Sequence, residues 1–211
     1  MTYFLLSLTN ACNKSCDYCV VKKWRNNPDF PDKITFDDIR KFLDDRLYAN
    51  DVVELTGGEP TLFSGLIYLL NYLKDKNAKV ILRTNGAGLN AWRKDYPNMT
   101  VALAKHDSAE EYIAKSKQWL LPHDLVLDGI PEHIRQKEQD KPIFVNDETS
   151  PYDRHDFANA YFITADGKVR FMPCCKDDMG TVWDFQPIKY HCCDNCSYML
   201  GAWNLAKRPS D

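Results

Sequence analysis

Three closely spaced cysteines near the start of the chain constrain its fold and chemistry most strongly. Cys12, Cys16 and Cys19 have the spacing Cys-x3-Cys-x2-Cys, directly after the apolar run of residues 3–8. A structural zinc is normally closed by four ligands, and the five histidines lie far from this loop in the sequence. Thiolate-only ligation favours an iron–sulfur cluster, and a cubane held by three cysteines keeps one iron open. The alternative is a zinc loop completed from a distance, or three reduced cysteines without metal.

A second motif, Gly57-Gly58-Glu59-Pro60, follows a predicted strand at residues 51–56. Two glycines at a strand end let the backbone approach a ligand without a Cβ in the way. Exposed carbonyls there can accept hydrogen bonds from an ammonium group, and Glu59 adds an anionic acceptor. Taken alone, the motif is more typical of an ordinary turn.

Together the two motifs resemble the radical S-adenosylmethionine (SAM) superfamily. The three cysteines, with Tyr18 just before the last, match its cluster signature, and the Gly-Gly-Glu-Pro motif stands where the family carries its GGE motif. The resemblance implies a SAM-binding [4Fe–4S] cluster and an electron donor of the flavodoxin or ferredoxin type. It also implies reductive cleavage of SAM to methionine and a 5′-deoxyadenosyl radical, which removes hydrogen from a substrate.

Strands and helices alternate along the first two thirds of the chain. Strands are predicted at residues 3–8, 51–56, 79–84, 100–104, 125–127 and 143–145, and helices at about 36–47, 62–76, 89–96, 108–119 and 131–139. Such alternation predicts an α/β fold with a parallel sheet and right-handed crossovers. Six units are too few for a closed eight-stranded barrel. We therefore expect a partial, open (β/α)6 TIM-type barrel, which the resemblance also implies.

Further polar residues fall at the carboxyl ends of the predicted strands, where barrels of this type place their chemistry. Asn85 either bonds the SAM ribose or carboxylate or caps its turn. The resemblance implies that Lys105 pairs with the SAM carboxylate and that His106 faces the substrate; a solvated side chain is the alternative for both. Asp128 is a candidate substrate or ribose contact by position. The predicted catalytic residues are Glu59, Lys105, His106 and Asp128, and Asn85 and Lys105 are predicted to bind the cofactor.

The alternation ends near Asn146, and a polar linker follows. Residues 160–164 and 168–172 flank Asp166-Gly167, which predicts a hairpin. We therefore divide the chain into a barrel at 1–146 and a small cysteine-rich extension at 147–211. Five cysteines follow the hairpin: Cys174, Cys175, Cys192, Cys193 and Cys196.

This hairpin and cysteine order resembles a twitch domain, the short half of the SPASM-type extension, which carries one auxiliary [4Fe–4S] cluster. The doubled pairs leave open which cysteines ligate. Cys193 and Cys196 are the first candidates, followed by Cys174 and Cys175, with Cys192 remaining. A zinc site is the alternative.

Composition narrows the class of partner. The formal net charge of −3 argues against bulk attraction to nucleic acid. Eight cysteines with neither an export signal nor a membrane-spanning run predict metal ligation in a reducing compartment, the cytoplasm. The oligomeric state stays open.

Two functions from different classes fit the sequence. The first is a radical SAM enzyme acting on a compact substrate: a small metabolite, a nucleotide or nucleic-acid base, or a short peptide. The basic run at residues 22–25 either lines the site mouth, where it suits a phosphate, carboxylate or base, or is a solvated surface. The second is a non-catalytic iron–sulfur or zinc module for electron relay or structure, and a module of that kind has no need of the Gly-Gly-Glu-Pro motif.

Overall fold

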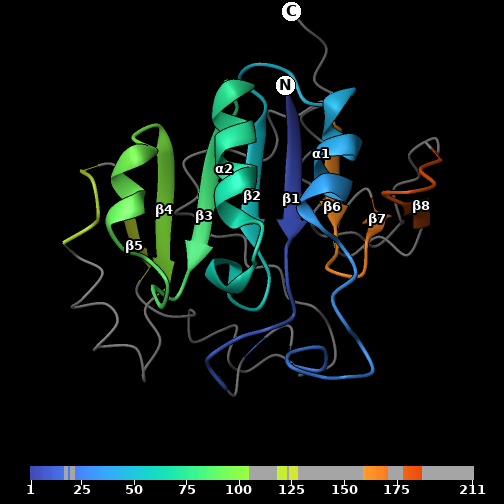
Figure 1. Cartoon of the computed structure of the whole chain (residues 1–211), viewed down its shortest axis with the longest axis horizontal. Helices are drawn as coiled ribbons and strands as arrows, with labels where there is room; N and C mark the ends of the chain where they lie inside the picture. The colour runs from blue at the N-terminus through green and yellow to red at the C-terminus, as the bar shows by residue number, and fades with distance from the viewer. Residues whose placement is uncertain are drawn as a thin grey trace, which may run out of the picture.

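The computed structural model describes residues 1–16, 19, 22–104, 118–122, 124–127, 159–170 and 178–186. These residues form one mixed sheet, with the strand order β5-β4-β3-β2-β1-β6-β7-β8 (Figure 1). The strands are β1 (Thr2–Ser7), β2 (Val52–Thr56), β3 (Lys79–Thr84), β4 (Met99–Ala104), β5 (Leu125–Leu127), β6 (Asn159–Ile163), β7 (Lys168–Arg170) and β8 (Asp178–Thr181). The pairings from β5 to β6 are parallel, and β7 and β8 add in antiparallel fashion.

Five of the six predicted barrel strands are confirmed as β1 to β5. The sixth, at 143–145, lies outside the described residues, as do the helix predicted at 131–139 and most of that at 108–119. The sixth parallel strand of the described sheet is instead β6, the first strand of the predicted hairpin. It pairs with β1 from Thr2↔Asn159 to Leu6↔Ile163. The strand that delivers the cysteine loop therefore has a parallel neighbour on both sides.

The first helix, α1 (Phe36–Asp44), begins at a complete capping box. Thr35 accepts a hydrogen bond from the backbone N–H of Asp38, and the Asp38 carboxylate accepts from the backbone N–H of Thr35 at 3.0 Å. Aspartate thus does the work that glutamate or glutamine usually does at this position. Ile39, Phe42 and Leu43 supply the buried face of the helix.

The second helix, α2 (Leu66–Asp75), begins four residues later than predicted. A short 3-10 turn, η1 (Pro60–Leu62), comes first because the Glu59 side chain caps it through the N–H of Thr61. Phe63 then has an extended backbone that interrupts the helical turn. A further 3-10 turn, η2 (Ala91–Asp95), replaces the short helix predicted at 89–96.

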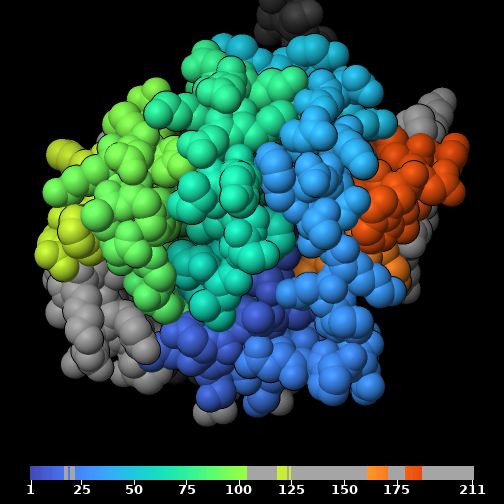
Figure 2. Space-filling view, viewed as in Figure 1, coloured from blue at the N-terminus to red at the C-terminus, as the bar shows by residue number. Residues whose placement is uncertain are grey.

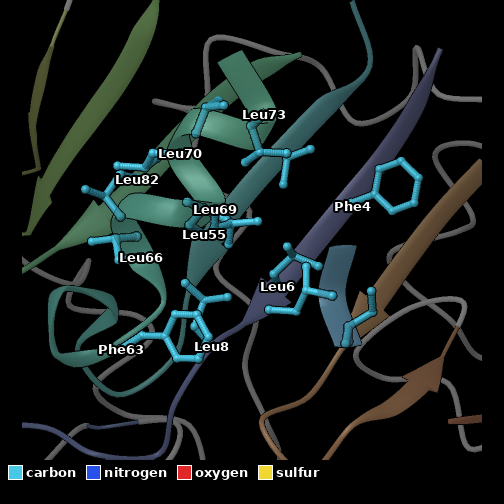
Figure 3. Close-up of a cluster of buried hydrophobic side chains, with 14 of the residues drawn as sticks. Phe4, Leu6, Leu8, Leu55, Phe63, Leu66, Leu69, Leu70, Leu73 and Leu82 are labelled. Atoms are coloured by element: carbon cyan, nitrogen blue, oxygen red, sulfur yellow. The ribbon is translucent and has the colours of Figure 1, made fainter. Parts of the chain in front are cut away.

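Both helices cover one face of the sheet, and the main core lies between them and the strands (Figures 1 and 3). Leu66, Leu69, Leu70 and Leu73 of α2 are all buried. They pack in one cluster with core residues of β1, β2 and β3: Phe4, Leu6, Leu55 and Leu82. Burial of each such side chain contributes about 1.5–3 kcal/mol to the stability of the fold. The packing of α2 against β1, β2 and β3 therefore stabilises the part of the sheet from which the loops emerge.

A buried ion pair ties η2 to the segment before β5. The side chains of Arg93 and Asp124 are both fully buried, with Arg93 Nη2 2.7 Å from Asp124 Oδ1. Arg93 also donates to the carbonyls of Tyr96 and Met99, and Asp124 accepts the backbone N–H of Val101. Every charge in this group therefore has hydrogen-bonding partners, as a buried charge requires.

The hairpin of β6 and β7 is hydrogen-bonded to the segment that precedes α1, and β6 also pairs with β1. The carbonyl of Ala165 accepts the backbone N–H groups of Lys33 and Ile34 at 2.9 and 3.1 Å. Trp183 donates its indole N–H to Asp38 at 2.7 Å, and its ring fills the space that a Cβ on Gly167 would need. The chain that returns from the cysteine loop is thereby supported by the hairpin turn. Among the described residues, none of the helices has the length and apolar character that crossing a bilayer requires.

Candidate cluster and cofactor site

The candidate site is assembled where β1, β2 and β3 end, at the lower edge of the sheet in Figure 1. The cysteine loop follows β1, the Gly-Gly-Glu-Pro turn follows β2, and Asn85 follows β3. Parallel neighbouring strands bring their carboxyl ends to one edge, so the three segments meet although they are far apart in the sequence.

The turn that follows β2 is hydrogen-bonded to the cysteine loop at Gly58 and Glu59. Gly58 N donates to the carbonyl of Thr9 at 2.7 Å, and Glu59 N donates to the carbonyl of Ala11 at 2.8 Å. One step earlier, Leu8 N donates to Thr56 O at 2.9 Å. The pairing of β1 with β2 therefore continues beyond both strands and fixes the loop against the turn.

Glycine is required at both positions because the loop backbone comes so close. A Cβ on Gly57 would lie 2.5 Å from the carbonyl oxygen of Thr9, and its φ of +135° is strained for other residues. A Cβ on Gly58 would lie 2.8 Å from the carbonyl carbon of Ala11 and nearer still to its oxygen. The sequence predicted close approach to a ligand; in the structure the first partner is the cysteine loop itself.

The carbonyl groups of the same two glycines remain available as acceptors. Within the described part of the chain, neither Gly57 O nor Gly58 O accepts a hydrogen bond from another backbone group, and both residues are half-buried. A pair of available carbonyls beside the cysteine loop is the kind of group that binds an ammonium donor.

Glu59 is buried, and its carboxylate joins the ends of β2 and β3. Oε1 accepts from the hydroxyl of Thr84 at 2.6 Å and from the N–H and hydroxyl of Thr61 at 3.1 and 2.7 Å. Oε2 accepts the backbone N–H of Asn85 at 2.8 Å. Sequence reasoning missed these contacts. Oε1 therefore has three donors and Oε2 has one, which leaves Oε2 with more capacity to accept a further hydrogen bond.

Asn85 is buried and caps its own turn. Its Oδ1 accepts the N–H of Ala87 at 3.0 Å, and its Nδ2 donates to Oδ1 of Asn13 in the cysteine loop at 2.9 Å. The turn-capping alternative is therefore present in the structure. The contact with SAM stays a prediction.

The three loop cysteines are half-buried, and none of them forms a disulfide within the described part of the chain. Burial raises the pKa of the Cys12 thiol, and the nearby Glu59 carboxylate and the other two thiols act in the same direction. The backbone N–H of Lys14, 3.4 Å from Cys12 Sγ, acts in the opposite direction. The thiols are thus close enough to influence one another's charge. Among the described residues, no group of three or more His, Cys, Asp or Glu side chains has the arrangement that one bound metal ion requires.

This donor set fits a multi-iron cluster, in which each thiolate binds its own iron atom. A single zinc ion would instead draw its thiolates to within about 2.3 Å of one point. The donor set consists of the thiols of Cys12, Cys16 and Cys19 on one short loop. The backbone N–H of Lys14 is donated to the sulfur of Cys12.

The basic run at residues 22–25 contacts the loop only in part. Lys22 and Lys23 are exposed, and Lys23 Nζ lies 6.0 Å from the centre of the Phe30 ring. Arg25 is half-buried and donates to the carbonyl of Cys16 at 3.4 Å. Arg25 therefore belongs to the loop's support, and the two lysines face solvent.

A polar group that the sequence reasoning missed lies within β1, β2 and β3. Glu54 is buried and accepts hydrogen bonds from the hydroxyl of Tyr3 and from Nε of Arg83. The signal that could have indicated it is a glutamate inside an otherwise apolar strand, since a buried carboxylate needs partners.

Several predicted site residues lie outside the described residues. They are Tyr18, Lys105, His106, Asp128, Cys174, Cys175, Cys192, Cys193 and Cys196. Their predicted roles remain predictions.

Comparison with known proteins agrees with the chemistry of this edge. The family model described as Radical SAM superfamily matches residues 6–106, just under half of the chain. This span contains the cysteine loop and the double glycine. The chain therefore carries a radical SAM domain.

Two curated relatives share this part of the chain. A GTP 3′,8-cyclase of Synechococcus elongatus is 36% identical over 90 residues, covering 41% of this chain and 28% of the relative. A 7-carboxy-7-deazaguanine synthase of Clostridium acetobutylicum is 34% identical over 116 residues, covering 52% and 50%. The chain thus spans half or less of the length of these relatives. The matched domain and the enzymes that share it support a radical SAM enzyme.

The fold extends the likeness. A crystal structure of BtrN in complex with AdoMet and 2-DOIA superimposes with a TM-score of 0.55 and 16% identity, covering 86% of this chain and 78% of that one. At this identity the likeness concerns the fold alone.

Proposed function

We propose that this chain is a radical SAM enzyme whose cluster is held by Cys12, Cys16 and Cys19. The observation that carries the proposal is the hydrogen-bonded contact between the double-glycine turn and the cysteine loop. It holds two available carbonyl acceptors beside three thiols. A [4Fe–4S] cluster held by these thiols would, once reduced by the electron donor, supply the electron that cleaves SAM to methionine and a 5′-deoxyadenosyl radical.

The chain's residues have distinct roles in this proposal. The carbonyls of Gly57 and Gly58, with Glu59 Oε2, accept the ammonium group of SAM, and Pro60 holds the turn that follows. Asn85 contacts the SAM ribose or carboxylate while keeping its hydrogen bond to the loop.

Residues predicted from the sequence complete the site. Tyr18 lines the cofactor next to the third cysteine, and Lys105 pairs with the SAM carboxylate. His106 faces the substrate, and Asp128 contacts either the substrate or the ribose. In this proposal β1 to β5 belong to a partial, open (β/α)6 barrel at 1–146, followed by a twitch-like extension at 147–211.

The substrate is a compact molecule, and we favour a nucleotide or a nucleic-acid base. Support comes from the relatives, whose names specify GTP and a deazaguanine. A small metabolite and a short peptide are the other two candidate classes of substrate. We propose an electron donor of the flavodoxin or ferredoxin type and a cytoplasmic location.

The function is tested on protein purified and reconstituted without oxygen. When reduced with dithionite and given SAM, it is expected to form 5′-deoxyadenosine and methionine, measured by chromatography, and the same sample without dithionite should form neither. Zinc in place of iron, or a reduced cluster that leaves SAM intact, would reject the proposal in favour of a zinc or electron-relay module.

A second expected result concerns the auxiliary cluster. Cys193→Ala with Cys196→Ala should lower the iron content by about four per chain, because each cubane contains four irons. SAM cleavage should continue in this variant, since the two cysteines belong to the second group. Unchanged iron content would contradict an auxiliary [4Fe–4S] cluster.

A further inference from the structure

The backbone of Cys12 is held on both sides by one side-chain amide. Oδ1 of Asn26 accepts the N–H of Cys12 at 3.0 Å, and Nδ2 of Asn26 donates to the carbonyl of Cys12 at 2.8 Å. The amide thus pairs with Cys12 as a neighbouring strand would. Only asparagine and glutamine carry a donor and an acceptor in one planar amide.

The backbone of Asn26 fixes the position of this amide. Its φ is +50°, a left-handed conformation in which asparagine is enriched. Its own N–H donates to the carbonyl of Asn10 at 3.1 Å. Asn26 therefore contacts the loop at three points: the carbonyl of Asn10 and both the N–H and the carbonyl of Cys12.

The segment that carries Asn26 is itself attached to the loop and the sheet. Asp32 accepts the backbone N–H of Asn10 at 2.7 Å and the hydroxyl of Thr9. Asn10 Nδ2 donates to the carbonyl of Phe30 at 3.0 Å. The next residues, Lys33 and Ile34, bind the hairpin carbonyl of Ala165. Figure 2 shows the cysteine loop (dark blue) and the segment that follows it (lighter blue) side by side at the lower edge of the molecule.

We propose that Asn26 is a positioning residue that preorganises Cys12 to bind the cluster. The inference rests on the proposed function, since it needs a cluster on the loop. Because its N–H and its carbonyl are both paired with Asn26, the Cα of Cys12 cannot move away from the cluster position without breaking hydrogen bonds, and only rotation about χ1 remains to direct the thiol. Partners of metal ligands typically change metal affinity by 10–100-fold when they are mutated.

The test compares two asparagine-to-glycine variants. Asn26→Gly removes both contacts with Cys12, while glycine still adopts a φ of +50°. Asn27→Gly makes the same chemical change one position later. The Asn27 side chain binds only Lys23 O and Asp29 N, both 3.0 Å away in its own segment, among the contacts described.

Iron loss to bathophenanthroline disulfonate is measured without oxygen on the reconstituted full chain. Asn26→Gly is expected to lose iron about tenfold faster than wild type, while Asn27→Gly should lose it at the wild-type rate. Amide hydrogen exchange at Cys12 should also accelerate in Asn26→Gly alone, with the unfolding temperature unchanged. The exchange measurement separates positioning from a general loss of stability.

The outcomes separate the two claims. Wild type that incorporates iron, together with an Asn26→Gly variant that loses it no faster, overturns the positioning role and leaves the proposed function standing. Wild type that incorporates no iron overturns both. Equal acceleration in both variants overturns the inference, because the segment then acts only through its rigidity.

Discussion

Gly58→Ala is expected to lower SAM cleavage by about a hundredfold. A Cβ at this position would lie 2.9 Å from the carbonyl oxygen of Asn10, and closer to that of Ala11. The contact is with backbone, so the loop and turn must separate by about 1 Å to reach ordinary van der Waals distance. Misplacement of about 1 Å in a catalytic site can cost about 10²-fold in rate.

Gly65→Ala is the matched control for this substitution. A Cβ on Gly65 would lie 2.8 Å from the Phe63 ring and 2.9 Å from Phe36 Cβ, at the start of α2. It crowds side chains away from the cysteine loop. Cleavage is measured as 5′-deoxyadenosine formed per bound cluster, and the unfolding temperature is recorded for both variants. Full cleavage by Gly58→Ala would show that the turn and loop do not need their present spacing.

Arg93→Met is expected to destabilise the protein by about 3–5 kcal/mol, the usual cost of breaking a buried ion pair by removing one partner. The change leaves the Asp124 carboxylate fully buried, with the carbonyls of Tyr96 and Met99 deprived of a donor. For a protein of this size the unfolding temperature should fall by about 10 °C. Thermal unfolding followed by circular dichroism measures it.

Arg40→Met removes an arginine from an exposed pair and serves as the control. Arg40 and Asp44 are 3.1 Å apart with both side chains well exposed, so the expected loss is below about 0.5 kcal/mol. Arg93→Met combined with Asp124→Leu should be less destabilising than the sum of the two single changes, because no lone charge remains buried. Additive losses would contradict a coupled pair.

Local patterns predicted much of this molecule. Strand alternation placed β1 to β5 within a residue or two of their observed bounds, since apolar runs between turn residues report burial directly. The Asp166-Gly167 dipeptide marked the hairpin correctly because Gly167 has the positive φ that such a turn needs. Cys12, Cys16 and Cys19 were predicted as cluster ligands from their spacing together with the Gly57-Gly58-Glu59-Pro60 motif. In each case the information lies within a few consecutive residues.

Contacts between distant parts of the chain could not be read in the same way. The parallel pairing of β6 with β1 joins residues more than 150 positions apart, and nothing in the apolar pattern of either strand specifies the neighbour. The partner of Gly58 and the reciprocal contacts of Asn26 with Cys12 likewise depend on where separate segments return.

The sequence by itself therefore determined the chemical inventory of this protein: three thiols in one loop, a double glycine at a strand end, and a sheet of alternating units. The tertiary structure decided which backbone fills the space that Gly57 and Gly58 leave open, and how the Glu59 carboxylate divides its hydrogen bonds. The physical reason is the distance along the chain over which each effect acts. Backbone propensity and hydrophobic periodicity act within a few residues, whereas polar partners and steric fit are set only when the strands align and bring their carboxyl ends together.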